Sequence, residues 1–160
     1  VGEFIERLQP EVSARLEPMT SAEAAVDGAH VVSSATNSPT PVFDGRRLAA
    51  GAHLNAIGTV TLDRREVDLV TVERSSVFVD LVEAALEEAG ELVAGVDAGV
   101  TRSEDWTEIG DVAAGRSPGR TRVDQVTFFK SVGHAVQDIV TASRIMKRAA
   151  ETGLARTVEL

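Results

Sequence analysis

The stretch AHLNAIG, residues 52–58, is a short apolar run that stops at a glycine. Its length and the turn residues that bound it predict a β-strand. HVVSSAT at 30–36 and SVFVD at 76–80 have the same character, and VTFFKSVG at 126–133 is predicted as a last strand leading into a turn. Because these runs are continuous and not alternating, we expect strands covered on both faces, as in a parallel sheet.

Helical patterns separate the predicted strands. Helices are predicted at residues 3–9, 20–30, 64–75 and 133–152. The alternation of strands with helices or long crossovers predicts an α/β fold with a parallel sheet. Two weaker patterns, at 13–18 and 155–160, are further strand candidates.

The helix predicted from Gly133 to Thr152 is the longest. One of its faces is apolar, formed by Ala135, Ile139, Ala142, Met146 and Ala149. Gly153 is placed to end it in the left-handed position after the last turn. We expect this face to meet a partner.

Composition narrows the class of protein. The chain has 160 residues, 43% of them hydrophobic, which suits one globular domain. Its net charge of −9 argues against binding to nucleic acid or to an anionic membrane through bulk charge. With no cysteine, disulfides and Cys-ligated zinc are excluded. No apolar run approaches a membrane span, so we expect a soluble, cytoplasmic protein.

Ligands of α/β sheets bind at the carboxyl ends of the strands. That rule selects four segments, Ser33–Asn37, Gly58–Thr61, Asp80–Glu83 and Lys130–Gly133. In the first, Ser34, Thr36 and Asn37 can hydrogen-bond a ligand or form a polar strand end. Ser131, in the last, can cap the long helix or hold a ligand.

Two other kinds of site find little support. The three histidines, His30, His53 and His134, are far apart and have no ligand-like spacing with carboxylates, so we expect hydrogen-bonded structural residues and no metal. The thirteen glycines never stand two residues apart, so neither a G-x-G-x-x-G turn nor a P-loop is present. Any pyrophosphate turn lies outside these 160 residues.

An ordered series of motifs resembles the ornithine cyclodeaminase/mu-crystallin family. The motifs are SAEAAVDGAHVVSSAT (21–36), GAHLNAIG (51–58), GELVAG (90–95), IGDVAAGRSPGR (109–120) and VTFFKSVGHAVQDIVTA (126–142). The resemblance implies NAD or NADP as cofactor, a small amino or imino acid as substrate, and a cytoplasmic homodimer. Only the C-terminal half of a member is matched, and the glycine-rich turn would lie upstream.

The same resemblance implies how the chain is divided. Residues 1–125 would be the C-terminal part of a dinucleotide-binding Rossmann domain, holding part of its parallel sheet. Residues 126–160 would return, through the long helix, to a substrate and dimerisation domain.

Matching positions one by one gives candidate site residues. Thr36 matches a threonine near the adenosine part of the cofactor, and Leu54, Asn55, Ala56 and Ile57 form the strand on the nicotinamide side. Arg64 matches a basic position near the cofactor. Ser131 matches a serine that contacts the nicotinamide, and Val132 a backbone contact to the substrate.

One position departs from the family pattern. Cyclodeaminases have an aspartate acid/base two residues after NAIG, where this chain has Val60. A valine can neither give nor take a proton, and Asp63 is a weak candidate to replace the aspartate. The resemblance therefore favours imine reduction or amino-acid dehydrogenation over cyclodeamination. The alternative is a non-catalytic, truncated member that acts only as a dimerisation or binding module, and we expect no turnover from these 160 residues alone.

Overall fold

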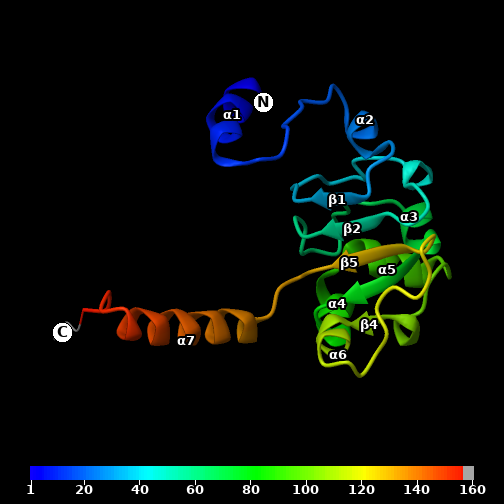
Figure 1. Cartoon of the computed structure of the whole chain (residues 1–160). Coiled ribbons are helices and arrows are strands. Elements are labelled where there is room, and N and C mark those ends of the chain that lie inside the picture. Colours follow the sequence, from blue (N-terminus) through cyan, green and yellow to red (C-terminus); the bar gives the residue numbers. More distant parts are fainter. Residues whose placement is uncertain (157–160) are drawn as a thin grey trace.

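A single parallel β-sheet organises the chain in the computed structural model, which describes residues 1–156 (Figure 1). Its five strands lie in the order β1-β2-β5-β3-β4, and every neighbouring pair is parallel. The strands are β1 (Val31–Ser34), β2 (His53–Ala56), β3 (Ser75–Val79), β4 (Thr107–Glu108) and β5 (Val126–Lys130). The predicted α/β fold is confirmed, with a strand inside each of the four apolar runs.

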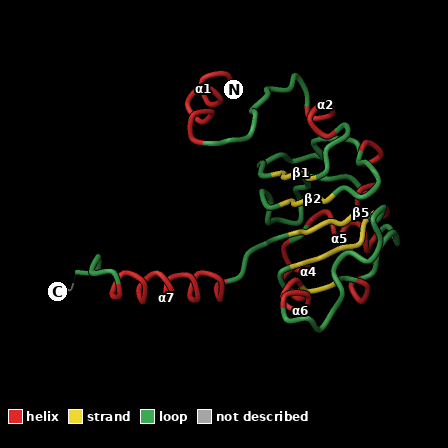
Figure 2. Tube along the Cα trace, in the orientation of Figure 1, coloured by secondary structure: helices red, strands yellow, loops and turns green. Residues whose placement is uncertain are grey.

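Helices lie before, between and after the strands (Figure 2). They are α1 (Gly2–Leu8), α2 (Ala22–Val26), α3 (Leu69–Arg74), α4 (Val82–Glu88), α5 (Gly90–Asp97), α6 (Ile109–Ala113) and α7 (Ala135–Glu151), with 3-10 turns η1 (Gln9–Glu11), η2 (Gly45–Arg47) and η3 (Ser103–Asp105).

Three element predictions need correction or fall outside the description. The helix expected from residue 64 begins only at Leu69, because the carboxylate of Asp68 caps it by accepting from Thr71 N at 2.8 Å. Residues 13–18 form no strand, since they pair with no other strand in the described chain. Of the strand predicted at 155–160, residues 157–160 lie outside the described residues.

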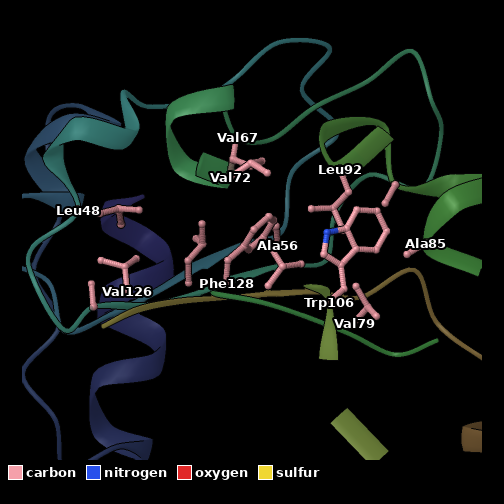
Figure 3. Packing of buried hydrophobic residues seen from close by; sticks show 14 of the residues in the cluster. Leu48, Ala56, Val67, Val72, Val79, Ala85, Leu92, Trp106, Val126 and Phe128 are labelled. Carbon is pink, nitrogen blue, oxygen red and sulfur yellow. The ribbon is translucent and has the colours of Figure 1, made fainter. Parts of the chain in front are cut away.

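One face of the sheet carries the hydrophobic core. Ala56 of β2 and Phe128 of β5 point to this face, beneath Val72 of α3 and Leu92 of α5 (Figure 3). Leu54, two residues before Ala56 on β2, belongs to the same buried cluster. All five side chains are buried. Burying such side chains stabilises a fold by about 1.5–3 kcal/mol each for the larger ones, so this face positions the strands.

The opposite face differs from the expected two-sided burial. On β2, His53 and Asn55 are only half-buried, alternating with the buried Leu54 and Ala56. A chain of hydrogen bonds runs along this face and satisfies its polar side chains. His53 Nδ1 lies 2.8 Å from Thr127 Oγ1, His53 Nε2 lies 3.1 Å from Asn55 Oδ1, and Asn55 Nδ2 donates to Ser33 Oγ at 3.3 Å. The expectation that His53 is a hydrogen-bonded structural residue is confirmed.

Helix α7 extends away from the sheet (Figure 1). None of its residues is buried, and Gly153 follows it with φ +71°, as its position predicts. The strand β5 just before it lies in the middle of the sheet, so the predicted domain division at residue 126 precedes a strand of the sheet. Within residues 1–156, no helix has both the length and the apolar character to cross a bilayer.

A buried ion pair joins the sheet to the helix layer. Lys130 is the last residue of β5 and Glu91 the second residue of α5. Both side chains are fully buried, with 3.1 Å between Lys130 Nζ and Glu91 Oε1. Neither oxygen of Glu91 receives a well-aligned hydrogen bond within the described chain. Burial therefore raises the pKa of Glu91 above its ordinary value, and the Lys130 ammonium opposes that rise.

Removing one partner of this pair should be much worse than removing both. We expect Lys130→Met to lower the free energy of unfolding by about 3–5 kcal/mol, because it leaves a buried carboxylate unpaired. The double variant Lys130→Met/Glu91→Leu should recover most of that loss. Urea unfolding of the purified protein measures both, with the exposed Lys147→Met as the control. A double variant no more stable than the single one would contradict this account.

Candidate functional site

The carboxyl ends of four strands meet at one edge of the sheet. Because all strands are parallel, the predicted segments after β1, β2, β3 and β5 share this edge. Main-chain hydrogen bonds join neighbouring ends, from Ile57 N to Ser34 O at 3.0 Å and from Ser131 N to Ala56 O at 3.2 Å. The structure therefore brings together the segments that the sequence selected.

Glu66 ties the ends of β1 and β2 to each other. Its carboxylate is fully buried and accepts from Ser34 Oγ at 2.7 Å, Thr36 N at 2.5 Å and Gly58 N at 2.7 Å. Burial raises the pKa of Glu66, but these hydrogen bonds outweigh it and hold the pKa below the ordinary value of 4.5. A Cβ at Gly58 would overlap the backbone of Thr36, so only glycine permits this close approach.

Lys130 of β5 and Gly90 of α5 lie against the main chain of the loop that follows β2. Lys130 Nζ donates to Thr59 O at 2.5 Å. Gly90, at the start of α5, lies so close to the carbonyls of Thr61 and Leu62 that a Cβ there would stand 2.8 Å from each. The backbone on both sides of position 60 is thus held by buried groups.

Asp80, directly after β3, holds the segment that follows β5. Its Oδ2 accepts from Ser131 Oγ at 2.6 Å and from the N–H groups of Val132 and Gly133, each at 3.0 Å. Ser131 therefore does not cap α7. The helix is capped by His134, whose Nδ1 accepts from Val136 N at 3.2 Å.

Four predicted site residues are accessible near this edge. Thr36 is exposed, and Arg64 lies beside it because Arg64 Nη1 donates to Asn37 O at 2.6 Å. Ile57, 51% exposed, follows β2. Ser131 is half-buried next to Asp80. This arrangement puts polar groups on two sides of an apolar side chain.

The remaining residues of the β2 stretch face elsewhere. The side chains of Leu54 and Ala56 are fully buried in the core, so they offer a ligand no accessible surface. Asn55 belongs to the hydrogen-bonded chain on the opposite face of the sheet. Half-buried Val132 presents its backbone N–H to Asp80.

The position of the family's aspartate carries no proton-transferring group. Val60 is 44% exposed. Asp63 is exposed, and a hydrogen bond from the Thr61 side chain, more than any other influence, lowers its pKa below the ordinary value of 3.8. Near neutral pH, Asp63 is therefore a carboxylate, which can accept a proton but has none to donate.

Sequence reasoning missed the roles of Glu66, Glu91 and the Asp80 carboxylate. In the sequence, Glu66 and Glu91 look like ordinary acids of an acidic chain, because nothing in their spacing marks them as buried. Asp80 was within a selected segment, and its position directly after an apolar strand was the available signal. Within residues 1–156, no group of three His, Asp or Glu side chains could hold a metal ion.

The fold defines an α/β protein with an open, parallel sheet, and comparison with known proteins gives its family. The sequence model of the ornithine cyclodeaminase/mu-crystallin family matches residues 2–153, so the chain belongs to that family. The Delta(1)-pyrroline-2-carboxylate reductase of Bacillus cereus (strain ATCC 10987 / NRS 248) is 37% identical over 142 residues, 88% of this chain and 43% of that protein.

Solved structures agree with this fold. Thermococcus litoralis Delta(1)-pyrroline-2-carboxylate reductase, in complex with NADH and L-proline, matches with a TM-score of 0.91 and 31% identity over 98% of this chain and 49% of that one. An archaeal alanine dehydrogenase dimer with bound NAD matches with a TM-score of 0.82 and 30% identity over 99% of this chain and 49% of that one. The chain spans about half the length of the proteins it matches.

The Glu66 bridge predicts an effect on stability that depends on pH. In Glu66→Gln, an amide N–H₂ must face a backbone or hydroxyl donor, so we expect the free energy of unfolding to fall by about 1–3 kcal/mol near neutral pH. Because the folded pKa of Glu66 is lowered, its contribution is present above the ordinary value of 4.5 and is lost as the pH falls through the folded pKa.

Chemical denaturation between pH of about 7 and about 3 tests this. The difference between wild type and Glu66→Gln should shrink toward acid, whereas the exposed control Glu73→Gln should differ little from wild type throughout. A difference that stays constant across the range would rule out the ionised bridge.

Proposed function

We propose that the protein carrying this chain is an NAD(P)-dependent reductase of a small imino acid. The observation that carries the proposal is the carboxyl edge, where Thr36, Ile57 and Ser131 are held in fixed places while position 60 lacks an acid. Its relatives include reductases of Delta(1)-pyrroline-2-carboxylate, and one solved relative holds NADH and L-proline.

The residues present fit part of a dinucleotide. Exposed Ile57 offers an apolar surface suited to a flat ring, and Ser131 beside it offers a polar group for the ring substituent. Thr36 and Arg64 lie together toward β1, where they suit the adenosine half. Arg64 uses Nη1 on Asn37 O and keeps other N–H donors for a ribose hydroxyl or a 2′-phosphate, so this edge is compatible with NAD and with NADP.

When bound, the reduced nicotinamide supplies the hydride that converts a C=N bond to an amine. The part of this chain is to orient the ring from β2 and β5 and to keep the position-60 loop in one place. Val60 takes no proton, and ionised Asp63 gives none. The proton for the amine nitrogen therefore comes from another group or from water.

This absence of an acid is what favours reduction over cyclodeamination. Cyclodeamination needs an acid/base beside the substrate, and Val60, at the position that the resemblance assigns to this group, is neither an acid nor a base. Reduction of an imine depends mainly on hydride transfer, so it tolerates valine there.

The activity test compares two reactions of the full-length protein. We expect it to oxidise NADH or NADPH when Delta(1)-pyrroline-2-carboxylate is added, followed at the absorbance of the reduced nicotinamide, with one cofactor consumed per amine formed. Ornithine with NAD should release no ammonia beyond the enzyme-free control. Ammonia release from ornithine without net cofactor consumption would refute the reductase assignment.

We also propose a homodimer assembled through α7. Apolar side chains of this helix stand in solvent in the described chain, with Ile139 67% and Met146 68% exposed. Such a stripe is costly to leave in water and marks an interface. One relative is a dimer in its structure. Residues 131–160 would then belong to the substrate and dimerisation domain, with the sheet, β5 included, in the cofactor domain.

A charge on the stripe should separate the subunits. Ile139→Arg places a cation within the apolar face, and we expect light scattering after size exclusion to show a monomer in place of a dimer. Thr141→Arg puts the same charge a little over half a turn around the helix, outside the stripe, and should stay dimeric. A dimeric Ile139→Arg protein would exclude this face from the interface.

We further propose a cytoplasmic location, as for a metabolic enzyme that uses a soluble cofactor and substrate. The competing proposal is a non-catalytic module that acts only in dimerisation or binding. Absence of both NADH binding and turnover in the full-length protein would select that alternative.

A further inference from the structure

The Asp80 carboxylate accepts an unusual number of hydrogen bonds for a single side chain at the carboxyl edge. Three donors from the segment after β5 converge on one oxygen, Oδ2, and Gln137 Nε2 donates to the other, Oδ1, at 3.0 Å. Asp80 is half-buried and comes from a different strand than the segment it binds. Its carboxylate therefore decides how that segment is presented.

We propose that Asp80 is a positioning residue that makes the Ser131 hydroxyl a hydrogen-bond acceptor for an N–H group of the bound ligand, namely the carboxamide N–H₂ of the nicotinamide. The inference rests on the proposed function, because it takes the ligand beside Ser131 to be the nicotinamide end of NAD(P).

The direction of the Ser131–Asp80 hydrogen bond follows from the chemistry of the two groups. A hydroxyl has one proton and two acceptor lone pairs, whereas a carboxylate can only accept. At 2.6 Å from Asp80 Oδ2, Ser131 Oγ must be the donor. Its single proton is thus committed to Asp80, and only lone pairs remain for a ligand.

Main-chain hydrogen bonds hold Ser131 in the position where its hydroxyl donates to Asp80. Its own backbone N–H donates to Ala56 O at 3.2 Å, which fixes the residue between β2 and β3. The next two N–H groups, of Val132 and Gly133, bind the same Asp80 oxygen. Gly133 has φ +83°, a left-handed conformation that favours glycine and turns the chain toward α7.

A site of this kind distinguishes ligands by whether they can donate. The nicotinamide carboxamide carries an N–H₂ donor that matches the free lone pairs of Ser131. In the 3-acetylpyridine analogue, a methyl group replaces the amide N–H₂, so the substituent has no hydrogen-bond donor. Since one neutral hydrogen bond contributes about 1 kcal/mol, NADH should bind about fivefold to tenfold more tightly than the reduced analogue.

The experiment measures dissociation constants of both reduced nucleotides for the full-length protein by titration calorimetry, with no turnover involved. Ser131→Ala removes the acceptor, and Asp80→Ala removes the group that orients it. Both variants should bring the ratio of the two constants close to one. A variant that only distorts the binding site would weaken the binding of both nucleotides equally and leave the ratio of their dissociation constants unchanged.

Asp80→Asn should rescue the ratio. The N–H groups of Val132 and Gly133 require an oxygen at the Oδ2 position, so the asparagine carbonyl takes that place and Ser131 still donates to it. The matched control is Glu87→Ala in α4, which removes an exposed carboxylate without disturbing Ser131. Its ratio should equal that of wild type.

Equal affinity of wild type for the two nucleotides would overturn the inference while leaving the proposed function intact. A preserved ratio in Asp80→Ala, or a lost ratio in Asp80→Asn, would likewise overturn the role of Asp80. If Asp80→Ala does not fold, Ser131→Ala and Asp80→Asn decide the question with the same expectations. If wild type binds neither nucleotide, the proposed function fails, and the inference fails with it.

Discussion

Backbone groups at the ends of parallel strands need partners once the ladder of the sheet stops. In this chain, charged side chains provide those partners. Glu66 accepts from the ends of β1 and β2, Asp80 accepts from the segment after β5, and Lys130 donates to the carbonyl of Thr59. The positions of the exposed residues at this edge follow from these contacts, because each exposed residue is next to a held one in the chain.

The cost of burying these charged groups is offset in different ways. Glu66 has several hydrogen-bond donors around its carboxylate, which compensate for its burial and lower its pKa. Glu91 lacks such donors and depends on the Lys130 ammonium, so burial dominates and its pKa is raised. Similar acids in the sequence therefore differ in electrostatic role according to the number of donors that meet them.

The sequence predicted β1, β2, β3 and β5 because each is a short apolar run bounded by turn residues, whereas β4, the two residues Thr107 and Glu108, has no such pattern and was not predicted. It also predicted that the segments containing Thr36, Gly58, Asp80 and Ser131 share one edge, since parallel strands allow nothing else. It failed where the answer depends on which group meets which in space. The spacing of residues 64–75 could not show that Asp68 delays the helix, and the motif that contains Ser131 did not reveal that its hydroxyl turns to Asp80.

Residue 60 occupies an unusual place in this arrangement. Its neighbours Gly58 and Thr59 are anchored through Glu66 and Lys130, while its own side chain reaches solvent. The backbone that presents this side chain thus does not depend on what the side chain is. An acid and a valine can therefore be exchanged at this position while the main chain around it stays the same.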